Sequence, residues 1–222
     1  MKTSIARKVS MALSAFFLMI FLLQHFAINV TSIFSGETFN NLSHFMGTNF
    51  AVQYIMQPIL IFGVVFHFVM GFILELKNKG ARNIKYAKNN GGANSSWMSR
   101  NMILSGLVIL AFMGLHFYDF WLPELKIKFV DGDWSGVLEG ETGLRYFTEL
   151  QHKFVNPIRV AIYCVAFIFL SLHLLHGFSS AFQSMGANNK YTRALSKFGV
   201  AYAILIPLGF VVIALFHHFN HC

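Results

Sequence analysis

Histidine is the residue type in this sequence with the clearest capacity for chemistry. The chain contains ten histidines, and four of them lie within separate long apolar segments: His25, His67, His116 and His173. An ionisable side chain in such a segment is costly and usually faces the interior of a helix bundle. A neutral imidazole there can ligate a metal or hydrogen-bond to a neighbouring helix, and the second role is commoner for a single histidine. One histidine on each of four segments favours a shared role as ligands.

The segments that carry these histidines are long enough to cross a membrane as helices. Spanning takes about 20 mostly apolar residues, and five stretches qualify: residues 9–30, 53–76, 102–122, 157–182 and 198–219. Only 12% of the 222 residues are charged, against about 25% in soluble domains. This composition excludes a soluble enzyme, a disordered chain and a disulfide scaffold. It predicts an all-α integral membrane bundle of five transmembrane helices, with residues 1–222 as a single domain.

The distribution of charge predicts how the bundle is oriented. Basic residues cluster before the first apolar stretch, between the second and third, and between the fourth and fifth. Most acidic residues lie in a hydrophilic loop of about residues 123–156, which Pro123 and the Asn156-Pro157 pair delimit. Because cytoplasmic loops are enriched in Lys and Arg, we expect a cytoplasmic N-terminus, with this loop and the C-terminus outside. The net charge of +8 therefore indicates topology and not nucleic-acid binding.

This orientation places the four histidines at two depths. The helices of His25 and His116 run outward, and both residues lie about 25 Å from the cytoplasmic edge. The helices of His67 and His173 run inward, and both residues lie roughly 21–24 Å below the outer edge. Two neutral imidazoles on opposite sides of a porphyrin ligate a b-type haem. The sequence therefore predicts two stacked haems, an outer one on His25 and His116 and an inner one on His67 and His173.

Two further features bear on the ligands. Gly63 and Gly71 lie four residues before and after His67, and Gly177 lies four residues after His173. A porphyrin against a helix needs small residues, although close helix packing needs them too; beside a ligand, we expect them to contact haem. His176, one turn after His173, is an alternative ligand whose depth matches that of His67 less well.

The segment His173-Leu-Leu-His-Gly-Phe-Ser-Ser-Ala-Phe-Gln183 is similar to the ligand helix of a known family. Five helices with one ligating histidine on each of the first four resemble the dihaem cytochrome b membrane-anchor subunit of succinate:quinone oxidoreductases, the single-anchor type of succinate:menaquinone reductases and quinol:fumarate reductases. In the family's segment the histidine four residues before the glycine is the ligand. The resemblance, which covers essentially the whole chain, therefore implies His173 in preference to His176.

The resemblance also implies partners, a direction for the electrons and a location. A flavoprotein subunit and an iron–sulfur subunit would dock on the cytoplasmic face and carry the dicarboxylate chemistry of the enzyme. Electrons would cross the inner and then the outer haem to a quinone, expected to be menaquinone, near the outer side; the reverse direction gives fumarate reduction. The implied location is the bacterial cytoplasmic membrane, and a higher oligomer of the complex stays open.

Candidate partners for the haem propionates and for quinone can be named. Haem propionates need cations, and we expect Arg159 at the outer haem and Arg100 or Lys77 at the inner one, although each also suits a headgroup anchor. The polar residues of the outer half are the candidates for quinone: Asn29, Tyr118 and Asp119. We expect the remaining histidines at the interface, for His217, His218 and His221, or in loops, for His44 and His152.

Two alternatives remain at this point. The cytochrome b subunit of a hydrogenase or formate dehydrogenase also ligates two haems by histidines, with a different distribution of ligands over its helices. A non-redox transporter or proton channel with buried histidines would carry no chromophore.

Overall fold

The computed structural model describes residues 4–80, 101–137, 143–187 and 191–220. Within these ranges the chain is helical apart from turns, short irregular segments and one isolated β-bridge between Val137 and Leu144. Among the described residues, five helical segments are long and apolar enough to cross a membrane: Ser4–Phe34, Val52–Asn78, Met102–Val130, Pro157–Ser184 and Thr192–Phe219. The predicted all-α, five-helix membrane bundle is therefore confirmed, whereas the side on which each terminus lies remains a prediction from charge.

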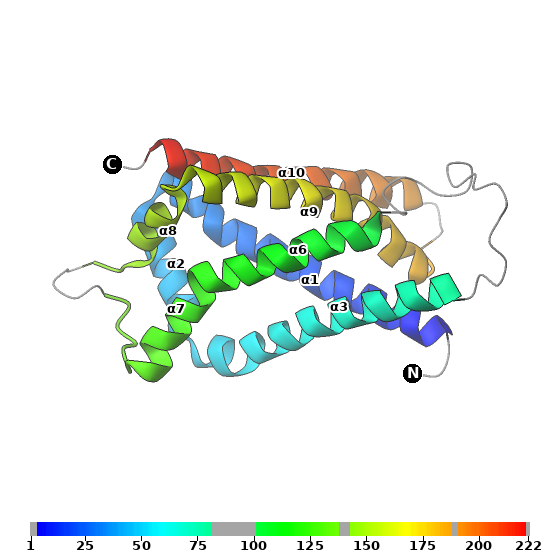
Figure 1. Cartoon of the computed structure of the whole chain (residues 1–222), viewed down its shortest axis with the longest axis horizontal. Helices are drawn as coiled ribbons and strands as arrows, with labels where there is room; N and C mark the ends of the chain where they lie inside the picture. Colours follow the sequence, from blue (N-terminus) through cyan, green and yellow to red (C-terminus); the bar gives the residue numbers. More distant parts are fainter. Residues whose placement is uncertain (1–3, 81–100, 138–142, 188–190, 221–222) are drawn as a thin grey trace.

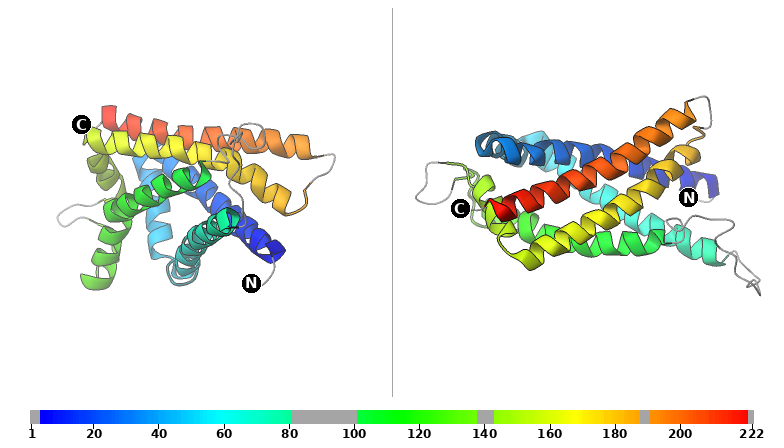
Figure 2. Two further views of the ribbon diagram at one scale, coloured as in Figure 1. Left: turned by 45° about the vertical axis from the view of Figure 1, so that its right-hand side comes forward. Right: turned by 90° about the horizontal axis from the view of Figure 1, so that it is seen from above.

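Four helices form a ring, and the fifth covers one side of it (Figures 1 and 2). Helices α1 (Ser4–Phe34), α3 (Gln57–Gly80), α6 (Met102–His116) and α9 (Pro157–Ser184) pack in that cyclic order, with α9 also packed on α1. The diagonal pairs, α1 with α6 and α3 with α9, lack comparable backbone contact. Helix α10 (Thr192–Phe219) packs on α9 and α1. Side chains of α1, α3, α6 and α9 can therefore meet along the axis of the ring.

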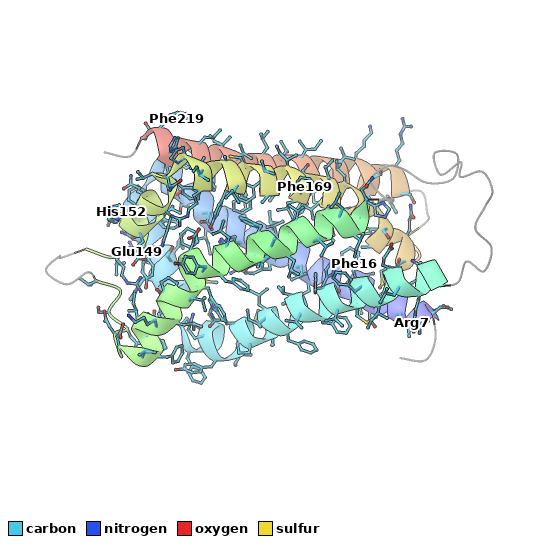
Figure 3. The ribbon with its side chains drawn as sticks, viewed as in Figure 1. Arg7, Phe16, Glu149, His152, Phe169 and Phe219 are labelled. Carbon is cyan, nitrogen blue, oxygen red and sulfur yellow. The ribbon has the colours of Figure 1, made fainter. Side chains whose placement is uncertain are left out.

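Large apolar side chains are exposed around the outside of the bundle. Ile20, Phe62 and Leu205, on three different helices, are 71%, 69% and 62% exposed. Such exposure would be costly in water and is expected for surfaces that contact lipid. The two ends of the bundle are distinct: Figure 3 shows Arg7 at one end and His152 and Phe219 at the other.

The hydrophilic segments at the second end are largely helical. The first contains α2 (Gly36–Thr48), and a π-helical turn at Val52–Met56 leads into α3. The predicted loop of residues 123–156 contains α7 (Leu122–Leu125), a π-helical turn at Lys126–Val130 and α8 (Tyr146–Phe154). The start of α9 agrees with the prediction, because Asn156 Oδ1 accepts the N–H groups of Ile158 and Arg159 at 2.9 and 3.2 Å.

The prediction that Pro123 ends the third helix is wrong. A π-helical turn at Phe117–Trp121 precedes the proline, and the Leu122 N–H bonds to the Phe117 carbonyl five residues back. Proline removes an N–H donor and crowds the preceding turn. A wider turn with longer-range hydrogen bonds accommodates this, so the helix continues to Val130.

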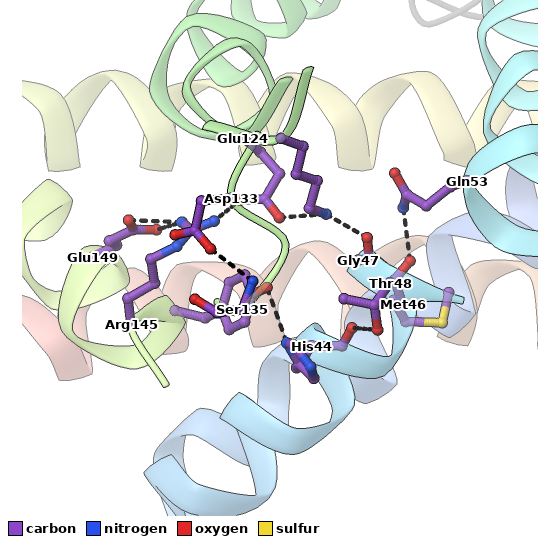
Figure 4. Close-up of polar contacts among 12 residues, drawn as sticks. His44, Met46, Gly47, Thr48, Gln53, Glu124, Asp133, Ser135, Arg145 and Glu149 are labelled. Carbon is purple, nitrogen blue, oxygen red and sulfur yellow. Dashed lines mark hydrogen bonds and ion pairs between the residues drawn. The ribbon is translucent and has the colours of Figure 1, made fainter. Parts of the chain in front are cut away.

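An ionic cluster with two buried cations, Lys128 and Arg145, joins the segments at this end (Figure 4). The Glu124 carboxylate pairs with Lys128 at 2.5 Å and with Arg145, and Arg145 also pairs with Glu149 at 2.8 Å. Lys128 donates to the Gly47 carbonyl of α2. Burial alone would lower the pKa of Arg145, but its hydrogen bonds to the two carboxylates hold it above the usual value. The cluster ties α2 and α8 to the extended third helix and so fixes the end of the ring.

Candidate functional site

The four predicted ligands meet in the two predicted pairs. The ring centroids of His25 and His116 are 5.8 Å apart, with the ring planes at 86°. Those of His67 and His173 are 6.3 Å apart, with the planes at 66°. Each pair joins diagonally opposite helices, so both lie near the axis of the ring.

The separations fit two imidazoles that share one metal between them. A zinc–imidazole bond is about 2.0–2.1 Å long, and we take a similar length for a bond to iron. The ring centre lies about 1.2 Å beyond the ligating nitrogen, so two imidazoles on opposite sides of one metal would have their ring centroids about 6.4 Å apart. The observed separations are near this value. The described residues contain no group of three or more His, Cys, Asp or Glu side chains able to hold a metal ion.

The hydrogen bonds of a serine favour one tautomer of His67. Ser14 Oγ lies 2.8 Å from the Met11 carbonyl, to which it donates, and 3.0 Å from His67 Nδ1. A hydroxyl has one proton, so with that proton on the carbonyl, Ser14 accepts from Nδ1–H. The neutral imidazole then carries its lone pair on Nε2, the protonation state that metal ligation through Nε2 requires.

The same arrangement supports His173. Ser105 Oγ donates to the Met102 carbonyl at 2.9 Å and lies 3.2 Å from His173 Nδ1. Ser14 and Ser105 are 9% and 6% exposed, so little water competes for these contacts. The ring contact of His67 is with His173, and this pairing leaves His176 outside the matched set.

Ser14 and Ser105 lie at the level of the inner histidine pair, and neither serine was predicted from the sequence. Ser14 lies eleven residues before His25 on α1, and Ser105 lies eleven before His116 on α6. Eleven residues make about three helical turns and about 16 Å of rise, so each serine shares a helix face with the histidine that follows. This repeated spacing was the signal that could have identified them.

The outer pair has different surroundings. Asn29 Nδ2 donates to the His25 carbonyl at 2.8 Å, and its contacts to the ring nitrogens of His25, at 3.4 and 3.5 Å, are too long to be strong hydrogen bonds. His116 Nδ1 is buried without a hydrogen-bond partner. Phe112 stacks on the His116 ring at 5.8 Å.

Asp119, a candidate for quinone binding, and Arg159, a candidate for binding a haem propionate, form an ion pair with each other. Asp119 is 1% exposed; its Oδ2 accepts the Tyr163 hydroxyl at 2.8 Å and pairs with Arg159 Nε at 3.2 Å. Arg159 therefore already has a carboxylate partner. Of the quinone candidates, Asn29 is bonded within its own helix, whereas Tyr118 is 65% exposed and lines a groove of about 350 Å³.

The glycines beside the ligands receive side chains of neighbouring helices. A Cβ at Gly63 would lie 2.7 Å from the Phe17 ring, whereas at Gly71 and Gly177 it would meet methionine side chains at 3.7 and 3.6 Å. Gly63 is therefore needed for the packing of α1 on α3, which is the alternative role considered for these glycines. Gly106, which the sequence analysis did not select, lies beside the His173 ring, with a Cβ-to-Cε1 distance of 3.7 Å.

The surroundings of the other histidines were not all as expected. His217 lies in the last turn of α10 and is fully buried within the protein: its Nε2 lies 2.9 Å from Ser32 Oγ, and its Nδ1 has no partner. His44 and His152 lie in α2 and α8 and not in loops. Arg100 and His221 lie outside the described residues, and Lys77 is exposed near the end of α3.

Comparison with known protein families, curated proteins and solved structures found no match for this chain. The functional inference therefore depends on the histidine geometry.

Proposed function

We propose that this protein is the dihaem cytochrome b membrane-anchor subunit of a succinate:quinone oxidoreductase. The observation that carries the proposal is the pair of histidine contacts on diagonal helices, at 5.8 and 6.3 Å between ring centroids. Hydrogen bonds to Ser14 and Ser105 use only the Nδ1 atoms of the inner imidazoles and do not account for the pairing of the rings. Two like pairs on the bundle axis, spaced as axial ligands of a single metal are spaced, favour haem.

In this proposal the histidines bind iron through Nε2. His67 and His173 donate from Nδ1 to Ser14 and Ser105, which holds each ring in the ligating tautomer. A b haem bound by two imidazoles supplies reversible one-electron transfer. The four-helix ring keeps the ligands apart from lipid and orders them in two levels about 16 Å apart along the helices.

The two levels provide a route for electrons across the membrane. The partners are a flavoprotein subunit and an iron–sulfur subunit, which bind at the end that carries the N-terminus, the predicted cytoplasmic face. Quinone, expected to be menaquinone, reacts at the opposite end, in a bacterial cytoplasmic membrane. Each charge that crosses the full field is worth about 2.3 kcal/mol per 100 mV, so the direction of turnover responds to membrane potential.

A pyridine haemochrome assay on the purified protein tests the proposal. We expect two b haems per chain. His67→Ala and His173→Ala should each remove the inner haem and leave the outer one, whereas the matched change His176→Ala should leave both. A preparation without a b-type α-band would refute the proposal and favour a non-redox role. Co-purification with a hydrogenase or formate dehydrogenase subunit, in place of a succinate-oxidising flavoprotein, would retain haem but assign the other family.

A further inference from the structure

We propose that Asp119 is the positioning residue of the outer haem ligand His116, accepting a hydrogen bond from its Nδ1–H through the unpartnered carboxylate oxygen Oδ1. This inference rests on the proposed function, because it concerns the imidazole when its other nitrogen binds iron. It concerns residues of this chain alone: His116, Asp119 and the two partners that orient the carboxylate.

When one ring nitrogen of His116 binds iron, the other needs a hydrogen-bond acceptor. A neutral imidazole has one N–H, so binding through Nε2 places the proton on Nδ1. In the structure His116 Nδ1 is buried and has no partner. A buried N–H without an acceptor is destabilising, and metal-bound histidines almost always donate from their second nitrogen. His116 therefore lacks the acceptor that its proposed role requires.

Asp119 has one carboxylate oxygen without a hydrogen-bond partner. Its Oδ2 has both a tyrosine and an arginine partner, but Oδ1 is buried with none. Among the buried side-chain atoms without a partner in the described residues, Oδ1 alone belongs to a group that, when ionised, only accepts. The others are N–H donors or imidazole nitrogens: Arg7 Nε, His116 Nδ1, Trp121 Nε1, Arg145 Nε and His217 Nδ1.

His116 and Asp119 lie close to each other in the chain and contact the same tyrosine. Asp119 lies three residues after His116, in the π-helical turn that directly follows α6. Tyr163 of α9 contacts both: its ring centroid is 6.3 Å from that of His116, and its hydroxyl is 2.8 Å from Asp119 Oδ2. Both side chains thus lie against one tyrosine, and the proposed hydrogen bond would form either directly, after a rotation of the imidazole, or through one bridging water. π-Helical turns of this kind are frequent at functional sites.

The consequence is a chemical difference between the two haem sites. The inner histidines donate to serine hydroxyls, which are neutral acceptors. A carboxylate is a stronger acceptor than a hydroxyl and makes the bound imidazole more basic. A more basic ligand stabilises ferric relative to ferrous iron, so Asp119 lowers the reduction potential of the outer haem.

Asp119→Asn in the purified full-length protein tests this role, with redox potentiometry and near-infrared spectroscopy of the ferric haems as readouts. The outer haem is identified as the one that His25→Ala removes. We expect Asp119→Asn to raise the midpoint potential of the outer haem and to move its ligand-to-iron charge-transfer band to lower energy, as for a less basic imidazole. The inner haem should keep its potential and its band.

Arg159→Gln is the control for through-space charge. It removes a charged partner of Asp119 while leaving the carboxylate and its Tyr163 hydrogen bond, so we expect the outer haem potential to fall and its charge-transfer band not to move to lower energy, in contrast to Asp119→Asn. If Asp119→Asn raises the potential without moving the band, Asp119 acts only through its charge and the inference is wrong. The absence of any shift, or equal shifts at both haems, also overturns it.

Two further outcomes are informative. Should Asp119→Asn lose the outer haem, its retention in Asp119→Glu would support the need for a carboxylate. Loss of both haems in both variants would make Asp119 a purely structural residue and overturn the inference. A wild-type protein that binds no haem would instead refute the proposed function.

Discussion

Replacing Ser105 by alanine removes the hydroxyl beside His173 Nδ1 and leaves the Met102 backbone carbonyl as the remaining hydrogen-bond partner of this imidazole. The serine is 6% exposed and lies 3.2 Å from the imidazole nitrogen, so water cannot readily replace it. A buried donor left unsatisfied costs about 1–3 kcal/mol, and 1.4 kcal/mol corresponds to tenfold in affinity. The affinity of the inner site for haem should therefore fall by at least about 5-fold and at most about 140-fold, a range that includes the roughly 10- to 100-fold loss typical when the partner of a metal-bound histidine is removed.

Transfer of haem to an excess of a haem-binding apoprotein measures this effect. The two α-bands report which haem leaves, and far-ultraviolet circular dichroism reports whether the helices remain. Ser179→Ala, at an exposed position on the same helix as His173, is the matched control and should behave as wild type. Ser14→Ala should reproduce the effect of Ser105→Ala, because its serine supports the other ligand of the inner pair.

If Ser105→Ala retains the inner haem as tightly as Ser179→Ala does, the hydroxyl does not hold the ligand. If both haems leave equally fast, the change has loosened the bundle and the tautomer argument has no support.

Two further predictions concern stability. Burial, together with the nearby Glu124 carboxylate, raises the pKa of Tyr146 to about 12. This pKa in the folded protein exceeds the value of about 10 in the unfolded chain. The neutral hydroxyl therefore stabilises the fold fully below pH 10, and this stabilisation is lost as the pH rises toward 12. Ultraviolet difference spectra of the phenolate and thermal unfolding should reveal this loss, and it should be absent in Tyr146→Phe. Gly63→Ala places a Cβ 2.7 Å from the Phe17 ring and should destabilise the bundle by about 1–3 kcal/mol. Gly71→Ala should be tolerated, because the nearest side-chain atom to the new Cβ is 3.7 Å away. Equal unfolding temperatures for the two variants would contradict this prediction.

The sequence alone was sufficient for the five spans and for the pairing of four histidines. Both depend on quantities that tertiary contacts hardly change: the apolar length needed to cross a bilayer and the fixed rise of a helix. Equal distances from the membrane edges therefore matched His25 with His116 and His67 with His173, and the structure places these rings together.

The groups that surround those rings depend on how the helices pack against one another. Ser14 reaches His67 from another helix, Tyr163 brings His116 and Asp119 to one place, and His217 is buried because α10 packs on α1 and α9. The continuation of the helix through Pro123 likewise depends on a π-helical turn whose hydrogen bonds no apolar periodicity reveals. Depth along a helix follows from sequence position, but a side chain's partner on another helix follows from rotation and packing, which are set by all the helices at once.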